Sequence, residues 1–324
     1  MLDRWAGALL IAVTVFGLRA ITLAWADAQT STVAAAVVER INYYRRLMNL
    51  PQVSADQASS ANDQSEAQSA LASPDASGGP IALRVVKGPG YLENGAGNPV
   101  SVLLMAASSA NDGAAIVDRI MALPLTALKL IDPQLVKVGT GISCDQHLCA
   151  VVLSVKRGLA KQDRLDLYEA SESDRFWNPR LGPIPPQRGK LKTPLEFPPD
   201  GTATPLLASS GVDFPELPAS CGDYRSQAGP PIILELGAGA SKDAELVIGP
   251  TSLTHDGSPV EFCLLDSSSY GSGEDGNLGK KELSAFGAVI IVPRKPLQTS
   301  GIYSVSIVAD STPYTWTFKA NARR

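Results

Sequence analysis

The hydrophobic pattern of the N-terminal half predicts three helices. Residues 34–48 and 112–122 each carry an apolar stripe with a helical period, and in the first of them Arg40, Arg45 and Arg46 fall largely outside the stripe. Residues 56–71 are rich in alanine and poor in large side chains. We expect this middle helix to pack closely against its neighbours while burying little apolar area.

Between residues 123 and 155 the pattern changes from a helical turn to two strands. A short apolar turn ends at an Asp-Pro pair, and strands predicted at 135–142 and 149–155 flank a tight turn. A shorter strand is expected at 81–86. Helices that precede and separate short strands are typical of a mixed α/β layer, so residues 29–160 are assigned to one such domain.

Beyond this layer the chain becomes rich in proline and then adopts a strand pattern. The composition of residues 161–211 predicts a linker or an extended arm along a domain surface. Within 212–324, six short strands are expected, at 231–236, 244–248, 260–266, 288–292, 301–309 and 314–319. They favour a β-sandwich of immunoglobulin-like type. The polar, glycine-rich stretch 266–277 is interpreted as a mobile loop between strands.

The first 28 residues have the features of a secretion signal. Arg4 precedes an apolar run, and Ala24, Ala26 and Ala28 form small-x-small cleavage patterns. An uncleaved membrane anchor is the alternative, because the stretch approaches the ~20 residues that span a bilayer. Arg19 interrupts the run and favours cleavage, since a charge in hydrocarbon is costly. We expect a secreted, periplasmic or cell-surface protein that meets the membrane only through this segment, if it stays uncleaved.

Composition and charge narrow the classes of function. The chain has 324 residues, of which 44% are hydrophobic and 19% charged, which fits two globular domains rather than disorder. With 28 basic and 32 acidic residues, its net charge is −4. Because there is no basic excess to attract phosphate backbones, nucleic acid is not expected as a partner.

Four cysteines in an exported chain predict two disulfides. Cys144 and Cys149 flank a candidate hairpin turn, and Cys221 and Cys263 would then pair within the C-terminal half. The chain has 2 histidines, His147 and His255, and both are expected in turns. Neither cysteine pair has the spacing and supporting histidines of a zinc site, so no metal and no cofactor is predicted.

Several pieces of the chain carry a family resemblance. They are the helical segment 38–45 (VERINYYR), the segment 56–71, Pro-Gly-Tyr at 89–91, and the helix–strand segment 121–141. Together they resemble the CAP superfamily of cysteine-rich secretory proteins, antigen 5 and pathogenesis-related proteins. Residues 197–201 and 215–237 look like the sandwich appended to some bacterial members. The resemblance implies an α+β fold, in which a CAP-like α-β-α sandwich with a shallow cleft is followed by an immunoglobulin-like β-sandwich.

In many members of that family, two histidines and two acidic residues line the cleft and can hold a divalent cation. The resemblance puts Glu66 and Thr126 where the histidines stand, Arg84 at one position of a related His-x-Glu pair, and Glu93 nearest the acidic position. No cleft histidine is therefore left. Glu66, Arg84 and Glu93 either form an ion-pair cluster that replaces the metal site or are three unrelated surface charges.

These observations favour a non-catalytic protein that binds or scaffolds at the cell envelope or outside the cell. Imidazole is the usual acid–base group near neutral pH, and its loss from the cleft argues against turnover. The partner would be a protein, a glycan or a lipid, and a purely structural spacer stays open. The alternative is a carboxylate- or metal-dependent hydrolase of the cell envelope that uses Glu66 and Glu93. The chain has no serine-hydrolase elbow, phosphate-binding loop or zinc-protease motif.

Overall fold

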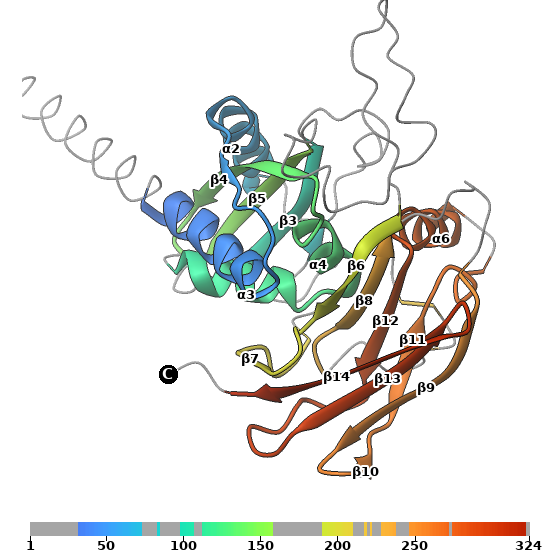
Figure 1. Cartoon of the computed structure of the whole chain (residues 1–324). Helices are drawn as coiled ribbons and strands as arrows, with labels where there is room; N and C mark the ends of the chain where they lie inside the picture. Colours follow the sequence, from blue (N-terminus) through green and yellow to red (C-terminus); the bar gives the residue numbers. More distant parts are fainter. Residues whose placement is uncertain are drawn as a thin grey trace, which may run out of the picture.

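The computed structural model describes residues 32–72, 83–84, 98–106, 112–157, 190–209, 217–218, 221, 228–237, 246–271 and 274–321. The predicted secretion signal, Glu93 and most of the predicted linker lie outside these residues. The described chain combines helices with several sheets and is therefore α+β (Figure 1). None of its described helices is long and apolar enough to cross a membrane.

A five-stranded sheet, called here the N-terminal sheet, organises the first half in the order β1-β4-β5-β3-β2. In that order the strands are β1 (Ser54–Ala55), β4 (Leu135–Cys144), β5 (Leu148–Arg157), β3 (Asn98–Ala106) and β2 (Leu83–Arg84). β1 pairs with β4 in parallel, and the other neighbours are antiparallel. The predicted strands correspond to β2, β4 and β5. β3 is not among them, because its nearly continuous apolar run lacks the alternation that indicates a strand.

Helices cover both faces of the N-terminal sheet (Figure 1). They comprise residues 32–47, α2 (Gln57–Ala72), α3 (Gly113–Met121) and α4 (Pro124–Leu130). Asp112 caps α3, since its Oδ1 accepts the N–H groups of Ala114 and Ala115 at 2.9 and 3.2 Å. Pro124 begins α4, where its missing N–H has no helical partner to lose. The helices closely match the three predicted segments and the predicted turn after residue 123.

The two faces of this sheet are packed in different ways. α2 lies so close to β4 that a Cβ atom on Gly139 or Gly141 would overlap atoms of Asp63. Among the described side chains, the buried apolar cluster on this side consists of Ala67, Ala150 and Val152, with the partly buried Ala70 and Leu71 packed against it. On the other side, the helix at 32–47, α3 and α4, called here the inner helices, pack against the sheet through large aliphatic side chains. The prediction that residues 56–71 pack closely but bury little apolar area is confirmed.

Two further sheets form the second half. The four-stranded sheet has the order β11 (Phe262–Leu265), β12 (Ala288–Pro293), β8 (Ile232–Gly237) and β6 (Lys190–Phe197). The five-stranded outer sheet has the order β10 (Ser258–Pro259), β9 (Ile248–His255), β13 (Tyr303–Ala309), β14 (Thr312–Ala320) and β7 (Thr202–Thr204). β6 and β7 lie in the segment predicted as a linker. Proline occurs on edge strands as well as in linkers, so its abundance did not separate the two.

The four-stranded sheet is buried on both faces and joins the halves of the molecule. Ile233 and Ile290 belong to the hydrophobic core of the inner helices, whereas Ile232 and Ile291 pack against the outer sheet. This division follows from the alternation of side chains along each strand. The layers therefore follow one another as α2, N-terminal sheet, inner helices, four-stranded sheet and outer sheet, and the inner helices share one core with the second half.

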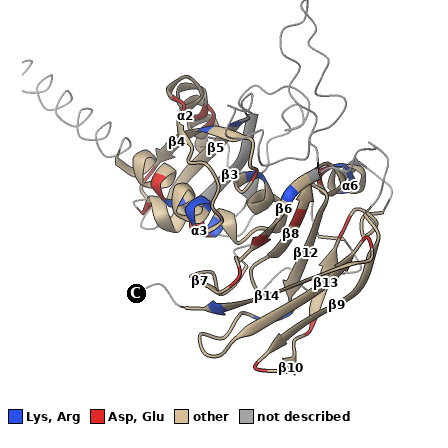
Figure 2. Cartoon of the chain, in the orientation of Figure 1, with Lys and Arg blue, Asp and Glu red and all other residues tan. Residues whose placement is uncertain are grey.

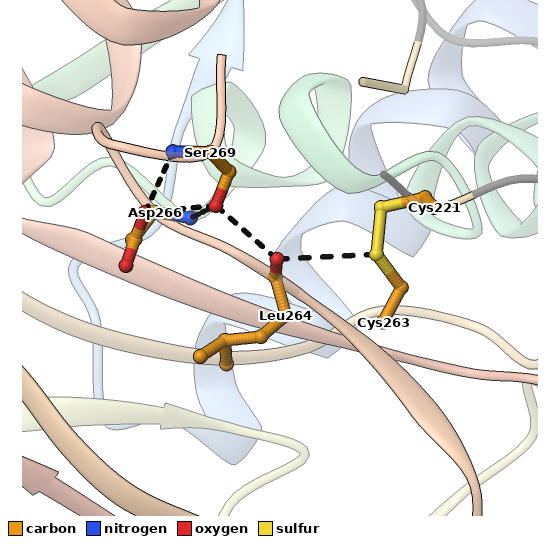
Figure 3. Close-up of a disulfide and its surroundings, with 5 residues drawn as sticks. All are labelled: Cys221, Cys263, Leu264, Asp266 and Ser269. Carbon is orange, nitrogen blue, oxygen red and sulfur yellow. Dashed lines mark hydrogen bonds between the residues drawn. A yellow bond between two sulfur atoms is a disulfide. The ribbon is translucent and has the colours of Figure 1, made fainter. Parts of the chain in front are cut away.

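The stretch predicted as a mobile loop at 266–277 begins with an ordered turn and ends in a helix. Asp266 Oδ1 accepts hydrogen bonds from Ser269 N and Ser269 Oγ, both at 2.8 Å (Figure 3). It also accepts one from Ser268 Oγ at 2.7 Å. The helix α6 (Glu274–Phe286) follows and contacts α4, β8 and β12. The prediction of a loop is wrong for this part, because the polar sequence hides an Asx turn and a helix with few large apolar residues.

Both predicted disulfides are present, Cys144–Cys149 at the β4–β5 hairpin and Cys221–Cys263 at β11. The second one lies beside the Asp266 turn (Figure 3). No cysteine of the described chain is free. Two disulfides fit an oxidising compartment such as the extracellular space.

Candidate functional site

The structure places the sequence-predicted site residues on separate elements. Glu66 is half-buried on α2, Arg84 ends β2, and Thr126 is fully buried in α4. Glu93 lies outside the described residues, and so does the side chain of Arg84. α2 and α4 cover opposite faces of the N-terminal sheet, so Glu66 and Thr126 are not brought together. Among the described residues, no three His, Cys, Asp or Glu side chains are grouped as metal ligands would be.

The contact between α2 and the N-terminal sheet is polar and contains a buried acid. Asp63 is 3% exposed, and its Oδ2 accepts a hydrogen bond from Ser154 Oγ at 2.7 Å. Burial raises the pKa of Asp63 to about 6, partly offset by the Ser154 hydrogen bond and reinforced by the charges of Glu66 and Asp56. Burial also raises the pKa of Glu66. Both carboxyl groups belong to α2, which packs against the N-terminal sheet.

Side chains of α2 also form hydrogen bonds with backbone groups of β4. Ser60 Oγ accepts the N–H of Thr140 at 3.1 Å, and one turn later the Gln64 amide bonds both the N–H and the carbonyl of Ile142, at 2.9 and 2.8 Å. Residues four apart share a helix face, so α2 can serve alternate residues of the strand. These hydrogen bonds explain why α2 is polar: its side chains hold the helix against β4 and need no role in an active site.

Arg45 corrects the prediction that the arginines of the first helix lie outside. Its side chain is fully buried, and it donates to the carbonyls of Pro51, Leu130 and Asp132 at 2.8, 3.0 and 2.9 Å. A fourth contact reaches the carbonyl of Leu135 at 3.4 Å. A guanidinium group can be buried when its donors are satisfied, and sequence periodicity cannot reveal these acceptors. Arg45 thereby fixes the chain after the first helix relative to the end of α4.

Beside these anchored segments lies a groove of about 390 Å³, called here the β6 groove. One wall is the end of the first helix and the residues after it, together with Pro133; the other wall is β6 and Pro199. The described lining residues are Leu47, Met48, Asn49, Leu50, Pro133, Leu191, Lys192, Thr193, Pro194, Leu195, Glu196 and Pro199. The rings of Tyr44 and Phe197, with centroids 5.9 Å apart, hold the first helix against β6.

The β6 groove is mostly apolar, with a charge at each end of its β6 wall. Lys192 is exposed, and Glu196 is half-buried four residues further along the strand. Burial raises the pKa of Glu196, the nearby Asp200 carboxylate reinforces the shift, and the Asp200 N–H partly offsets it. Figure 2 shows positive and negative charge on β6, and negative charge on the neighbouring β8.

A second hollow, of about 460 Å³, lies on the exposed face of the outer sheet. Its floor carries the hydroxyl side chains of Ser252, Thr254, Ser304, Ser306, Thr315 and Thr317. Serine and threonine are ordinary residues for the solvent face of a sheet, and this hollow lies on one sheet, whereas the β6 groove lies between two walls from distant segments. We therefore take the β6 groove as the candidate site. Sequence reasoning missed it because its walls come from segments about 140 residues apart.

No protein-family model matches the chain, and the curated proteins contain no match to it.

Proposed function

We propose that this chain is an exported, non-catalytic protein that binds a macromolecular partner at the cell envelope or outside the cell. The signal-like N-terminus and the two disulfides support export. The layering of α2, sheet and inner helices supports a CAP-like α-β-α unit, and the two packed sheets support an immunoglobulin-like sandwich. The family resemblance itself rests on the sequence pieces given above.

The observation that carries binding is the β6 groove. Its apolar walls are held open by contacts that do not depend on an occupant, namely the Arg45 hydrogen bonds and the Tyr44–Phe197 packing. Its volume of about 390 Å³ lies within the range of ligand sites in proteins, roughly 300–1,000 Å³. Preformed, mostly apolar hollows with a few placed charges are the usual form of such sites.

Site-specific photo-crosslinking in cells that export the full chain tests this proposal. A crosslinking amino acid at Thr193, exposed in the groove, is compared with one at Thr315, exposed on the outer sheet. We expect an adduct of one defined mass from Thr193 that is lost in Leu47→Glu and kept in Ile302→Glu, a change at an exposed apolar residue elsewhere. Equal adducts at both positions, or none at Thr193, would contradict binding in the groove.

One observation favours the hydrolase as a second candidate. The raised pKa values of Asp63 and Glu66 are the kind of shift that acid–base catalysis uses. Turnover of cell-wall fragments by the purified chain, with and without zinc and magnesium, decides between the two. Hydrolysis that Glu66→Gln abolishes, with the fold retained, would replace the binding proposal.

A further inference from the structure

From the shape of the β6 groove we infer that its ligand is an extended peptide, which adds to the free edge of β6 as a further strand. This inference rests on the proposed function, because it names the partner of the same groove.

The groove runs along the edge of β6 rather than over its face. Six consecutive residues, 191–196, line it. On the face of a strand only alternate residues would do so, because successive side chains point to opposite sides. Among the strands that the structure describes, β6 is also the last of its sheet and pairs with β8.

Backbone groups at this edge are available for pairing. Lys190 pairs with Gly237, and Leu195 pairs with Glu235. Between these two pairs the chain advances by five residues in β6 and by two residues in β8. Residues 191–194 therefore bulge out of the ladder. Among the residues that the structure describes, no backbone hydrogen bond joins this bulge to another segment. An unpaired edge of this kind is a template for a strand from another chain. Pro194 removes one donor but leaves its carbonyl.

The opposite wall suits the side chains of such a strand. Leu47 and Leu50 flank the groove from the end of the first helix, and Pro133 extends this apolar surface. A peptide lying beside β6 would contact this apolar wall. Strand addition combined with pockets for alternate side chains is an established mode of peptide recognition.

Charge defines which peptide fits. Lys192 and Glu196 lie four residues apart along β6, at the two ends of the wall that it forms. Two carboxyl groups lie at the Glu196 end, because Asp200 is close enough to Glu196 to reinforce the rise of its pKa. A basic side chain would be favoured at this end and an acidic one beside Lys192. The ligand is thus an apolar strand with opposite charges four residues apart.

Fluorescence anisotropy with two labelled, end-blocked peptides tests the inference on the full mature chain. Both have alternating valine and threonine between an acidic and a basic residue four positions apart, and they differ only in the order of the two charges. We expect one order to bind at least about tenfold more tightly, and N-methylation of its alternate backbone nitrogens to weaken binding by a similar factor. The reversal Lys192→Glu/Glu196→Lys should exchange the preference of the groove for the two orders.

The outcomes separate this inference from the proposed function. If neither peptide binds while the Thr193 crosslink persists, the groove binds another class of molecule, and strand addition is refuted although binding stands. If the N-methylated peptide binds as well as its parent, the groove is only an apolar site, such as one for lipid, and the inference fails. Loss of both the crosslink and peptide binding would overturn both proposals. Thermal unfolding of the charge-reversed variant checks that it is folded.

Discussion

Lys129 Nζ lies 2.8 Å from Glu282 Oε1 in an ion pair whose side chains are only 6% and 5% exposed. Lys129 belongs to α4 of the first half and Glu282 to α6 of the second, so the pair joins the two halves inside their shared core (Figure 1). Two charges removed from water are costly, and each is tolerated because the other is present. The interaction energy of this ion pair therefore measures how strongly the two halves are coupled.

We expect removal of one charge of this pair to destabilise the whole chain. Lys129→Met or Glu282→Leu alone leaves a buried charge without its ion-pair partner and should cost about 3–5 kcal/mol. The double variant removes both charges with similar volume and should recover most of this loss. Urea unfolding of the four proteins measures the coupling. Additive losses in the double variant would show that the pair does not couple the halves.

The buried Asp63 makes the docking of α2 depend on pH. Its pKa rises from an ordinary value of 3.8 to about 6 in the folded chain, so folding favours the protonated acid. Its contribution to stability is complete below about pH 4 and is lost as the pH rises through 6. Glu66, whose pKa is also raised, acts in the same direction. Asp56 acts in the opposite direction: burial alone would raise its pKa, but Ser59, Lys137 and Lys156 lower it.

Asp63→Asn tests this dependence, because the amide keeps the shape of the side chain and cannot ionise. We expect the difference in unfolding free energy between the wild type and Asp63→Asn to change by about 2 kcal/mol between pH 4 and 7.5, in favour of the variant at the higher pH. Chemical unfolding at several pH values provides the measurement. An unchanged difference across this range would mean that the pKa of Asp63 is the same in the folded and the unfolded chain.

Close approach of α2 to the N-terminal sheet requires the absence of a side chain at Gly141. A Cβ atom there would overlap the main chain of Asp63 and Gln64, neither of which can move without displacing the helix. We expect Gly141→Ala to destabilise the chain by about 1–3 kcal/mol. Gly271→Ala is the matched control, since no atom lies within 4 Å of the added carbon. Equal thermal stability of the two variants would argue against the close contact.

The two disulfides should contribute unequally to stability. Cys221–Cys263 closes a separation of 42 residues, whereas Cys144–Cys149 closes one of 5. On the chain-entropy model, which ignores strain, this corresponds to about 4 and about 2 kcal/mol. Cys221→Ser/Cys263→Ser should therefore lower the unfolding free energy by more than Cys144→Ser/Cys149→Ser. The reverse order in urea unfolding would show that local packing outweighs loop length.

Local signals explain which parts of the fold were predictable. The helices at 32–47 and α3 carry their own apolar stripe, and β13 and β14 of the outer sheet alternate visibly along the sequence. β3 was not predicted because it is almost uniformly apolar. The strand expected at 244–248 overlaps β9 (Ile248–His255) at its first residue alone. α6 was missed because its apolar residues are few and its fold depends on contacts with α4 and β12.

The candidate site could not be predicted in the same way. A family resemblance directed attention to Glu66 and Thr126, but the N-terminal sheet separates the helices that carry them. Whether Glu93 and the Arg84 side chain adjoin Glu66 stays a prediction, since neither lies in the described residues. The groove depends instead on β6, within a segment whose prolines predict a linker.

The sequence by itself determined the helices of the first half, the strands that alternate visibly and the α+β composition, because periodicity is a property of neighbouring residues. The hairpin around Cys144 and Cys149 also left Cys221 and Cys263 to pair with each other. Only the tertiary structure decided that Arg45 is buried, since its acceptors are the carbonyls of residues distant in the chain. It likewise decided that the two halves share one core and that β6 lies beside Leu47 as the last described strand of its sheet. Burial and strand pairing depend on which distant segments meet, and no local pattern encodes that meeting.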